Sequence, residues 1–80
     1  MNIWVQTSGT DVGARSYKRM DGLKLWYHLF EWRFKTVDCS WGNVPQDGWK
    51  PQLTTEEAQA WTEREIPLHL PRAQFVLQTL

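Results

Sequence analysis

The sequence predicts a small α+β domain in which one helix packs on a largely antiparallel sheet, with its elements in the order β-β-β-α-β. Three observations predict it: alternating β-prone segments, a helix with a strong N-terminal cap, and a length of 80 residues, which leaves room for one core. Hydrophobic residues are 41% and charged residues 22% of the chain, which is typical of a folded domain rather than a disordered one. We therefore expect residues 1–80 to form a single domain.

Two short strands are expected near the N-terminus. Residues 2–7 alternate, so that Val5 and Trp4 lie on opposite faces of a first strand. A glycine-containing loop leads to a second strand at about residues 16–20. The Asp21-Gly22 dipeptide after it is typical of a two-residue type I′ hairpin turn, because both positions accept a positive φ.

Residues 23–37 fit two templates. At helical spacing, Leu23, Tyr27 and Phe34 lie on one apolar stripe; at period two, Trp32 and Phe34 lie opposite Arg33. The aromatic composition and the preceding turn favour the strand, which at this length needs a bend or bulge near its middle.

The second half of the chain is expected to contain a loop, a helix and a last strand. Residues 38–52 are rich in glycine, proline, asparagine and aspartate and predict a long loop. Thr54 followed by Glu57 forms a capping box at the start of a helix, which Pro67 ends. Residues 75–80 predict the last strand.

Cysteine usage and hydropathy predict a cytoplasmic location without membrane association. Cys39 is the single cysteine, so the chain forms no intramolecular disulfide, whereas small secreted domains usually contain several. No apolar run approaches the roughly 18 residues that span a bilayer, and the N-terminus lacks a basic segment followed by an apolar one.

The residues that carry chemistry predict a protein that is not an enzyme and holds no metal or cofactor. Cys39 with His28 or His69 is the one nucleophile-base pairing to consider, and no signature motif surrounds it. One cysteine and two histidines are fewer than the four ligands of a structural zinc site. The five glycines are scattered and form no phosphate-binding motif.

The preferred functional hypothesis is a protein-binding module. The chain has six tryptophans, and Trp41 and Trp49 lie in the long loop, where anchors for a partner are common. The candidate partner-binding residues are Trp41, Trp49, Asn43 and Lys50. The partner is expected to be another protein or protein complex, with a homo-oligomer through a sheet edge or face as a further option.

In general character only, a small chain without a reactive motif is similar to the accessory proteins by which phages inhibit host complexes, anti-CRISPR proteins among them. No sequence motif contributes to this comparison. The chain has nine basic and nine acidic residues, so its net charge of +0 indicates no class of partner.

The alternative hypothesis is binding of single-stranded nucleic acid through residues 15–35. This segment combines aromatic rings with a local excess of positive charge, as sequence-tolerant single-strand binders do. Its basic residues are Arg15, Lys18, Arg19, Lys24, Arg33 and Lys35. Strand alternation argues against it, because Trp32 and Phe34 are expected on the face opposite to Arg33 and Lys35.

Overall fold

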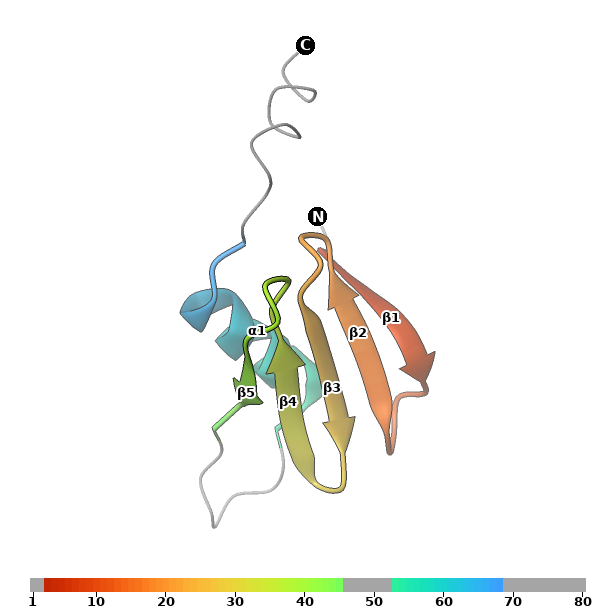
Figure 1. Cartoon of the computed structure of the whole chain (residues 1–80). Coiled ribbons are helices and arrows are strands. Elements are labelled where there is room, and N and C mark those ends of the chain that lie inside the picture. The colour runs from red at the N-terminus through yellow and green to blue at the C-terminus, as the bar shows by residue number, and fades with distance from the viewer. Residues whose placement is uncertain (1–2, 46–52, 69–80) are drawn as a thin grey trace.

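The computed structural model describes residues 3–45 and 53–68, and in these ranges five strands precede one helix (Figure 1). The strands are β1 (Trp4–Gly9), β2 (Arg15–Arg19), β3 (Lys24–His28), β4 (Glu31–Lys35) and β5 (Trp41–Asn43), and the helix is α1 (Thr55–Glu65). The strands form one antiparallel sheet in the order β1-β2-β3-β4-β5, so each pairs with its neighbour along the chain. The predicted α+β class is confirmed.

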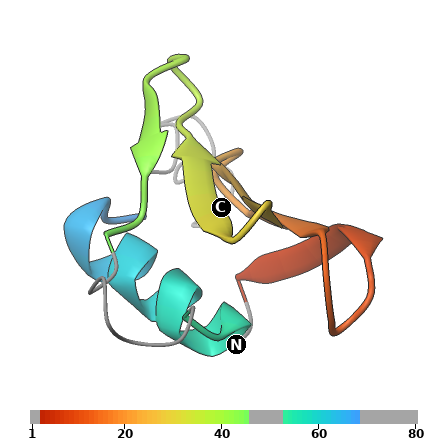
Figure 2. The same ribbon diagram turned by 90° about the horizontal axis from the view of Figure 1, so that it is seen from below.

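The helix lies across one face of the sheet, and no other element in the described ranges covers the opposite face (Figure 2). Thr54 caps the helix as predicted: its side chain accepts from the backbone N–H of Glu57, and the Glu57 carboxylate accepts from the backbone N–H of Thr54. The last helical residue is Glu65, two residues before Pro67. We call the uncovered side of the sheet the open face.

The single strand expected over residues 23–37 is wrong in one respect, because the chain reverses at its middle. Leu29 and Phe30 form a two-residue turn between β3 and β4, with φ of 51° and 66°. Positive φ at both central residues is the property of a type I′ turn, which asparagine and glycine usually supply. The preference for strand over helix is correct, and the expected bend is a hairpin.

The turn at Asp21-Gly22 is also built differently from the expectation. Only Gly22 has a positive φ, at 96°, and its N–H donates to the carbonyl of Arg19 at 2.8 Å. The N–H of Arg19 in turn donates to the carbonyl of Leu23 at 2.8 Å, so the loop has three residues rather than two. The Asp21 carboxylate explains the difference, because it folds back onto the Arg19 guanidinium.

The order of the elements differs from the predicted one. Residues 41–43, expected within the long loop, form β5 at the edge of the sheet, so five strands rather than three precede the helix. Glycine at position 42 hid this strand, because glycine is unfavourable in strand interiors; here its small size lets the Phe34 ring lie against the backbone. The last strand, expected at residues 75–80, lies outside the described residues.

The core lies between the sheet and the helix and is rich in large rings. Trp4, Tyr17 and Trp32 are buried together with Leu25 and Ala58. A tryptophan buries about 200 Å², worth about 5 kcal/mol before the cost of ordering the chain. Both buried indoles are satisfied: Trp32 donates to the carbonyl of Leu53 at 2.9 Å, and Trp4 donates to the Glu63 carboxylate at 3.0 Å.

Candidate functional site

A row of three lysines crosses the open face. The strand registers place Lys18 opposite Lys24, and Lys24 opposite Lys35, on three adjacent strands. Val5 and Trp41 continue the same line onto the two edge strands. All five side chains are exposed. We call Lys18, Lys24 and Lys35 the lysine row.

The opposed lysines of the row destabilise the sheet by repelling one another. Directly opposed side chains on neighbouring strands have Cβ atoms about 5 Å apart, and like charges in such pairs are destabilising. Among the described residues there are two ion pairs, Arg19 with Asp21 and Arg33 with Glu31, so no lysine of the row has an acidic partner there. A ligand with several negative charges would remove this repulsion.

Two tryptophans share the open face with the lysine row. Trp26 is half-buried on β3, two residues from Lys24, and therefore points to the same side of the sheet. Trp41 is 66% exposed on β5 and pairs with Lys35. The open face thus combines aromatic rings with positive charge.

Two hollows lie beside the lysine row. One has a volume of about 420 Å³ and is lined by Thr7, Ser16, Tyr17, Lys18, Lys24 and Trp26. The other, of about 260 Å³, is lined by Lys18, Gly22, Lys24, Lys35, Thr36, Val37 and Cys39. Lys18 and Lys24 contribute to both, so the middle of the row is accessible from either side.

The structure divides the six predicted nucleic-acid-binding residues between the two faces of the sheet. Arg15 and Arg19 face the helix. The guanidinium of Arg15 lies 4.9 Å from the centre of the Tyr27 ring and 5.0 Å from that of Trp32, and its Nε donates to the Thr55 hydroxyl at 2.9 Å. These two arginines therefore have structural contacts and are withdrawn from the candidate site.

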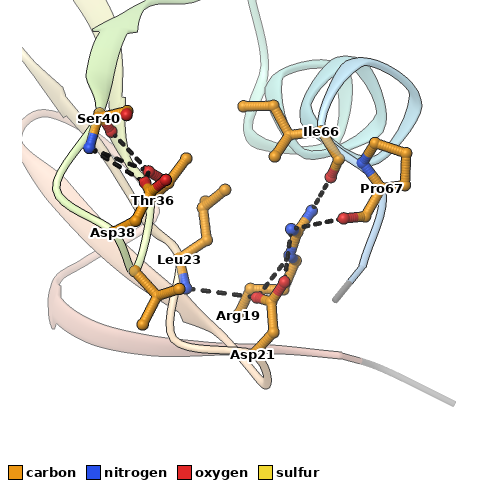
Figure 3. Close-up of a pocket in the computed structure, with 9 residues that line it drawn as sticks. Arg19, Asp21, Leu23, Thr36, Asp38, Ser40, Ile66 and Pro67 are labelled. Carbon is orange, nitrogen blue, oxygen red and sulfur yellow. Dashed lines mark hydrogen bonds and ion pairs between the residues drawn. The ribbon is translucent and has the colours of Figure 1, made fainter. Parts of the chain in front are cut away.

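Arg19 fastens the sheet to the end of the helix. It is 2% exposed, forms a bidentate ion pair with Asp21 and donates to the carbonyls of Ile66 and Pro67 at 2.6 and 3.3 Å. Figure 3 shows these contacts on one side of a hollow of about 480 Å³. Because the carboxylate and the two carbonyls occupy the guanidinium, this hollow offers a ligand little positive charge.

The opposite side of that hollow is the turn between β4 and β5 (Figure 3). The Thr36 hydroxyl donates to the Asp38 carboxylate, and the backbone N–H of Ser40 donates to the same carboxylate oxygen at 3.3 Å. These hydrogen bonds, that of Thr36 above all, hold the pKa of Asp38 below its ordinary value. The carboxylate thus serves to close the turn.

The remaining four basic residues lie on the exposed side of the sheet. They are Lys18, Lys24, Lys35 and Arg33, and the last is paired with Glu31 at 2.6 Å with both side chains nearly half exposed. The expected separation of rings from charges holds for β4, where Trp32 and Phe34 face the core. On β3 the arrangement differs, because Trp26 shares the side of Lys24.

The predicted partner-binding residues are described in part. Trp41 and Asn43 are exposed on β5, opposite Lys35 and Arg33 respectively. Trp49 and Lys50 lie outside the described residues. Trp41 lies at the end of the line of side chains that contains the lysine row. The protein-binding and nucleic-acid-binding hypotheses therefore involve the same surface.

Cys39 and His28, two of the residues considered for nucleophilic catalysis, are not brought together. Cys39 is exposed in the turn that follows β4, whereas His28 pairs with Glu31 at the other end of that strand. His69 lies outside the described residues. Within residues 3–45 and 53–68 no group of three or more histidine, cysteine, aspartate or glutamate side chains is arranged to hold a metal ion.

Sequence reasoning included the lysines but missed the row that they form. The row depends on the reversal at Leu29-Phe30, which brings Lys24 opposite Lys35, and neither turn residue favours the positive φ that this reversal needs. None of the helices in the described ranges is long and apolar enough to cross a membrane. No family model, curated protein or solved structure matches this chain.

Proposed function

We propose that the protein binds single-stranded nucleic acid on the open face of its sheet. The observation that carries the proposal is the lysine row, three opposed positive charges without acidic partners in the described structure, on the same face as Trp26 and Trp41. Proteins that bind single-stranded nucleic acid commonly combine a basic surface, which contacts the phosphates, with aromatic rings, which stack on the bases. The open face has both kinds of side chain.

The dimensions of the row suit an extended chain of phosphates. Neighbouring strands are about 4.8 Å apart, so Lys18 and Lys35, two strands apart, are separated by about 10 Å. Lysine side chains are long and flexible, so each ammonium group can reach a phosphate that does not lie directly above its own β-strand.

The two tryptophans favour a single strand over a duplex. Bases in a duplex are stacked on one another, whereas unpaired bases are free to stack on a protein ring, at about 1 to 3 kcal/mol each. Trp41 is exposed enough to offer a ring face, and the hollow beside Trp26 gives access to its ring. A cytoplasmic location, as expected from the single cysteine, is part of this proposal.

Fluorescence anisotropy of a labelled oligonucleotide at several salt concentrations tests the proposal. Each phosphate contact on a single strand contributes about −0.7 to the slope of log K against log salt, so replacing all three lysines by glutamine makes the slope shallower by about 2. Arg64→Gln is the matched control, because Arg64 is an exposed cation in the last turn of α1. The proposal is wrong if the wild type does not bind at low salt, or if the triple variant binds as the wild type does.

A second candidate function, protein binding, is supported by the position of Trp41. β5 is an edge strand of the sheet, and Trp41 is 66% exposed there with Asn43 exposed beside it. Edge strands accept a further strand from a partner, and an exposed tryptophan is a common binding anchor. An inhibitor of a host complex, as phages use, is one special case.

Affinity capture from nuclease-treated extract separates the two candidates. A protein that remains bound after nuclease treatment and is lost with Trp41→Ala supports the second candidate. Because Trp41 is mostly exposed, we expect this variant to unfold at nearly the wild-type temperature. Capture that depends on nucleic acid, or that Trp41→Ala leaves unchanged, contradicts protein binding through this residue.

A further inference from the structure

The hollow beside Trp26 has the chemistry of a nucleotide subsite. Its volume is about 420 Å³, within the range of small-ligand sites. Lys18 and Lys24 supply positive charge, Trp26 supplies a ring, and Thr7 and Ser16 supply hydroxyl groups. Among the described residues, no acidic side chain lines it. We call it the Trp26 hollow.

The hydroxyl groups at the Trp26 hollow are linked to one another. The Ser16 Oγ lies 2.9 Å from the Thr7 Oγ1 and is also hydrogen-bonded to the Ser8 Oγ. Each hydroxyl group has one O–H donor and two lone pairs. The two hydrogen bonds use two of the three donors, so one O–H donor and several lone pairs remain for a ligand.

The hydroxyl groups and the Trp26 ring are contributed by neighbouring strands. Ser16 on β2 is the direct register partner of Trp26 on β3. Lys18 and Lys24 form the next register pair on the same face, about 7 Å further along the strands. A nucleotide whose base lies on the ring thus has cations on one side for its phosphate and hydroxyl groups on another for its sugar.

We propose that the Trp26 hollow binds one ribonucleotide of a single strand and that its hydroxyl groups select RNA over DNA. The ribose 2′-OH both donates and accepts a hydrogen bond, and the Thr7–Ser16 pair complements both properties. Deoxyribose offers neither, so with DNA the two side chains keep only each other, the Ser8 hydroxyl and water. This inference rests on the proposed function and names the substrate class of its site.

Anisotropy with two labelled oligonucleotides of about 12 residues, oligouridylate and oligodeoxyuridylate, tests the inference because they differ only in the 2′-OH. One or two net hydrogen bonds, at about 1 kcal/mol each, correspond to about five- to thirty-fold tighter binding of the RNA by the wild type. Thr7→Val with Ser16→Ala is expected to remove this preference and to leave the affinity for the deoxy strand within about two-fold. Circular dichroism verifies that the variant is folded.

The matched control is Thr10→Ala, which removes an exposed hydroxyl that donates to the Val12 carbonyl outside the hollow. This variant must keep the wild-type preference for RNA. Equal affinity of the wild type for both strands overturns the inference and leaves single-strand binding standing, as does a preference that survives Thr7→Val with Ser16→Ala. If neither strand binds at low salt, the proposed function fails and this inference falls with it.

Discussion

Lys24→Glu is expected to stabilise the fold while it weakens binding of nucleic acid. Lys24 lies between Lys18 and Lys35, with one opposed lysine on each side. The substitution turns two repulsive cross-strand pairs into two attractive ones, and each such pair contributes about 0.2 to 1 kcal/mol. All three side chains are exposed, which favours the lower half of that range. We therefore expect a gain of about 0.5 to 1.5 kcal/mol in the free energy of unfolding.

For a domain of this length, such a gain raises the melting temperature by about 2 to 12 °C. Thermal unfolding followed by circular dichroism at low and high salt measures it. Lys24→Gln is the matched control: it removes the repulsion without adding attraction, so its melting temperature should fall between those of the wild type and Lys24→Glu.

The salt dependence decides whether the effect is electrostatic. At about 1 M salt the Debye length is about 3 Å, and the differences between the three proteins should nearly vanish. If Lys24→Glu melts at or below the wild-type temperature in low salt, the lysine row is not under repulsion and the main argument for an anionic ligand is lost.

Three further predictions concern the fold. Arg19→Met removes the ion-pair partner of the buried Asp21 carboxylate and should cost about 3 to 5 kcal/mol in urea unfolding; a loss below about 1 kcal/mol contradicts this account. Leu29→Asn with Phe30→Gly relieves two positive-φ residues and should add about 1 to 2 kcal/mol, whereas a lower melting temperature would show that the native turn side chains stabilise the hairpin. Because the pKa of Asp38 is lowered in the fold, the stabilisation by its carboxylate is present above pH 3.8 and is lost as the pH falls further. Asp38→Asn should therefore have a lower melting temperature than the wild type at pH 7 and the same melting temperature in acid. A difference in melting temperature that persists in acid refutes this account.

Local signals in the sequence predicted the helix but not the sheet register. The capping box of Thr54 and Glu57 lies within four residues and is readable without knowledge of the fold. The turn at Leu29-Phe30 is not, because neither residue favours a positive φ, and the surrounding strands impose it. Propensity was overridden there by the pairing of β3 with β4.

The candidate site depended on that missed turn. In one continuous strand Lys24 and Lys35, eleven positions apart, would be separated by about 36 Å, whereas the hairpin makes them direct neighbours. Burial was equally hard to predict: Arg19 belongs to a basic segment, but Asp21 and the two carbonyls beyond the helix hold it inside. The tryptophans divide between core and surface, since Trp32 is buried whereas Trp41 is 66% exposed.

The meander has a consequence for how the chain acquires its structure. Every strand pairs with the one made just before it, so the sheet closes only short loops and its formation should be rapid. During synthesis from the N-terminus, all five strands precede the helix, and until residue 66 has left the ribosome Arg19 lacks its carbonyl partner and the inner rings lack their cover. The nascent sheet is thus an aggregation-prone intermediate, and docking of the helix is the step that covers its apolar inner face.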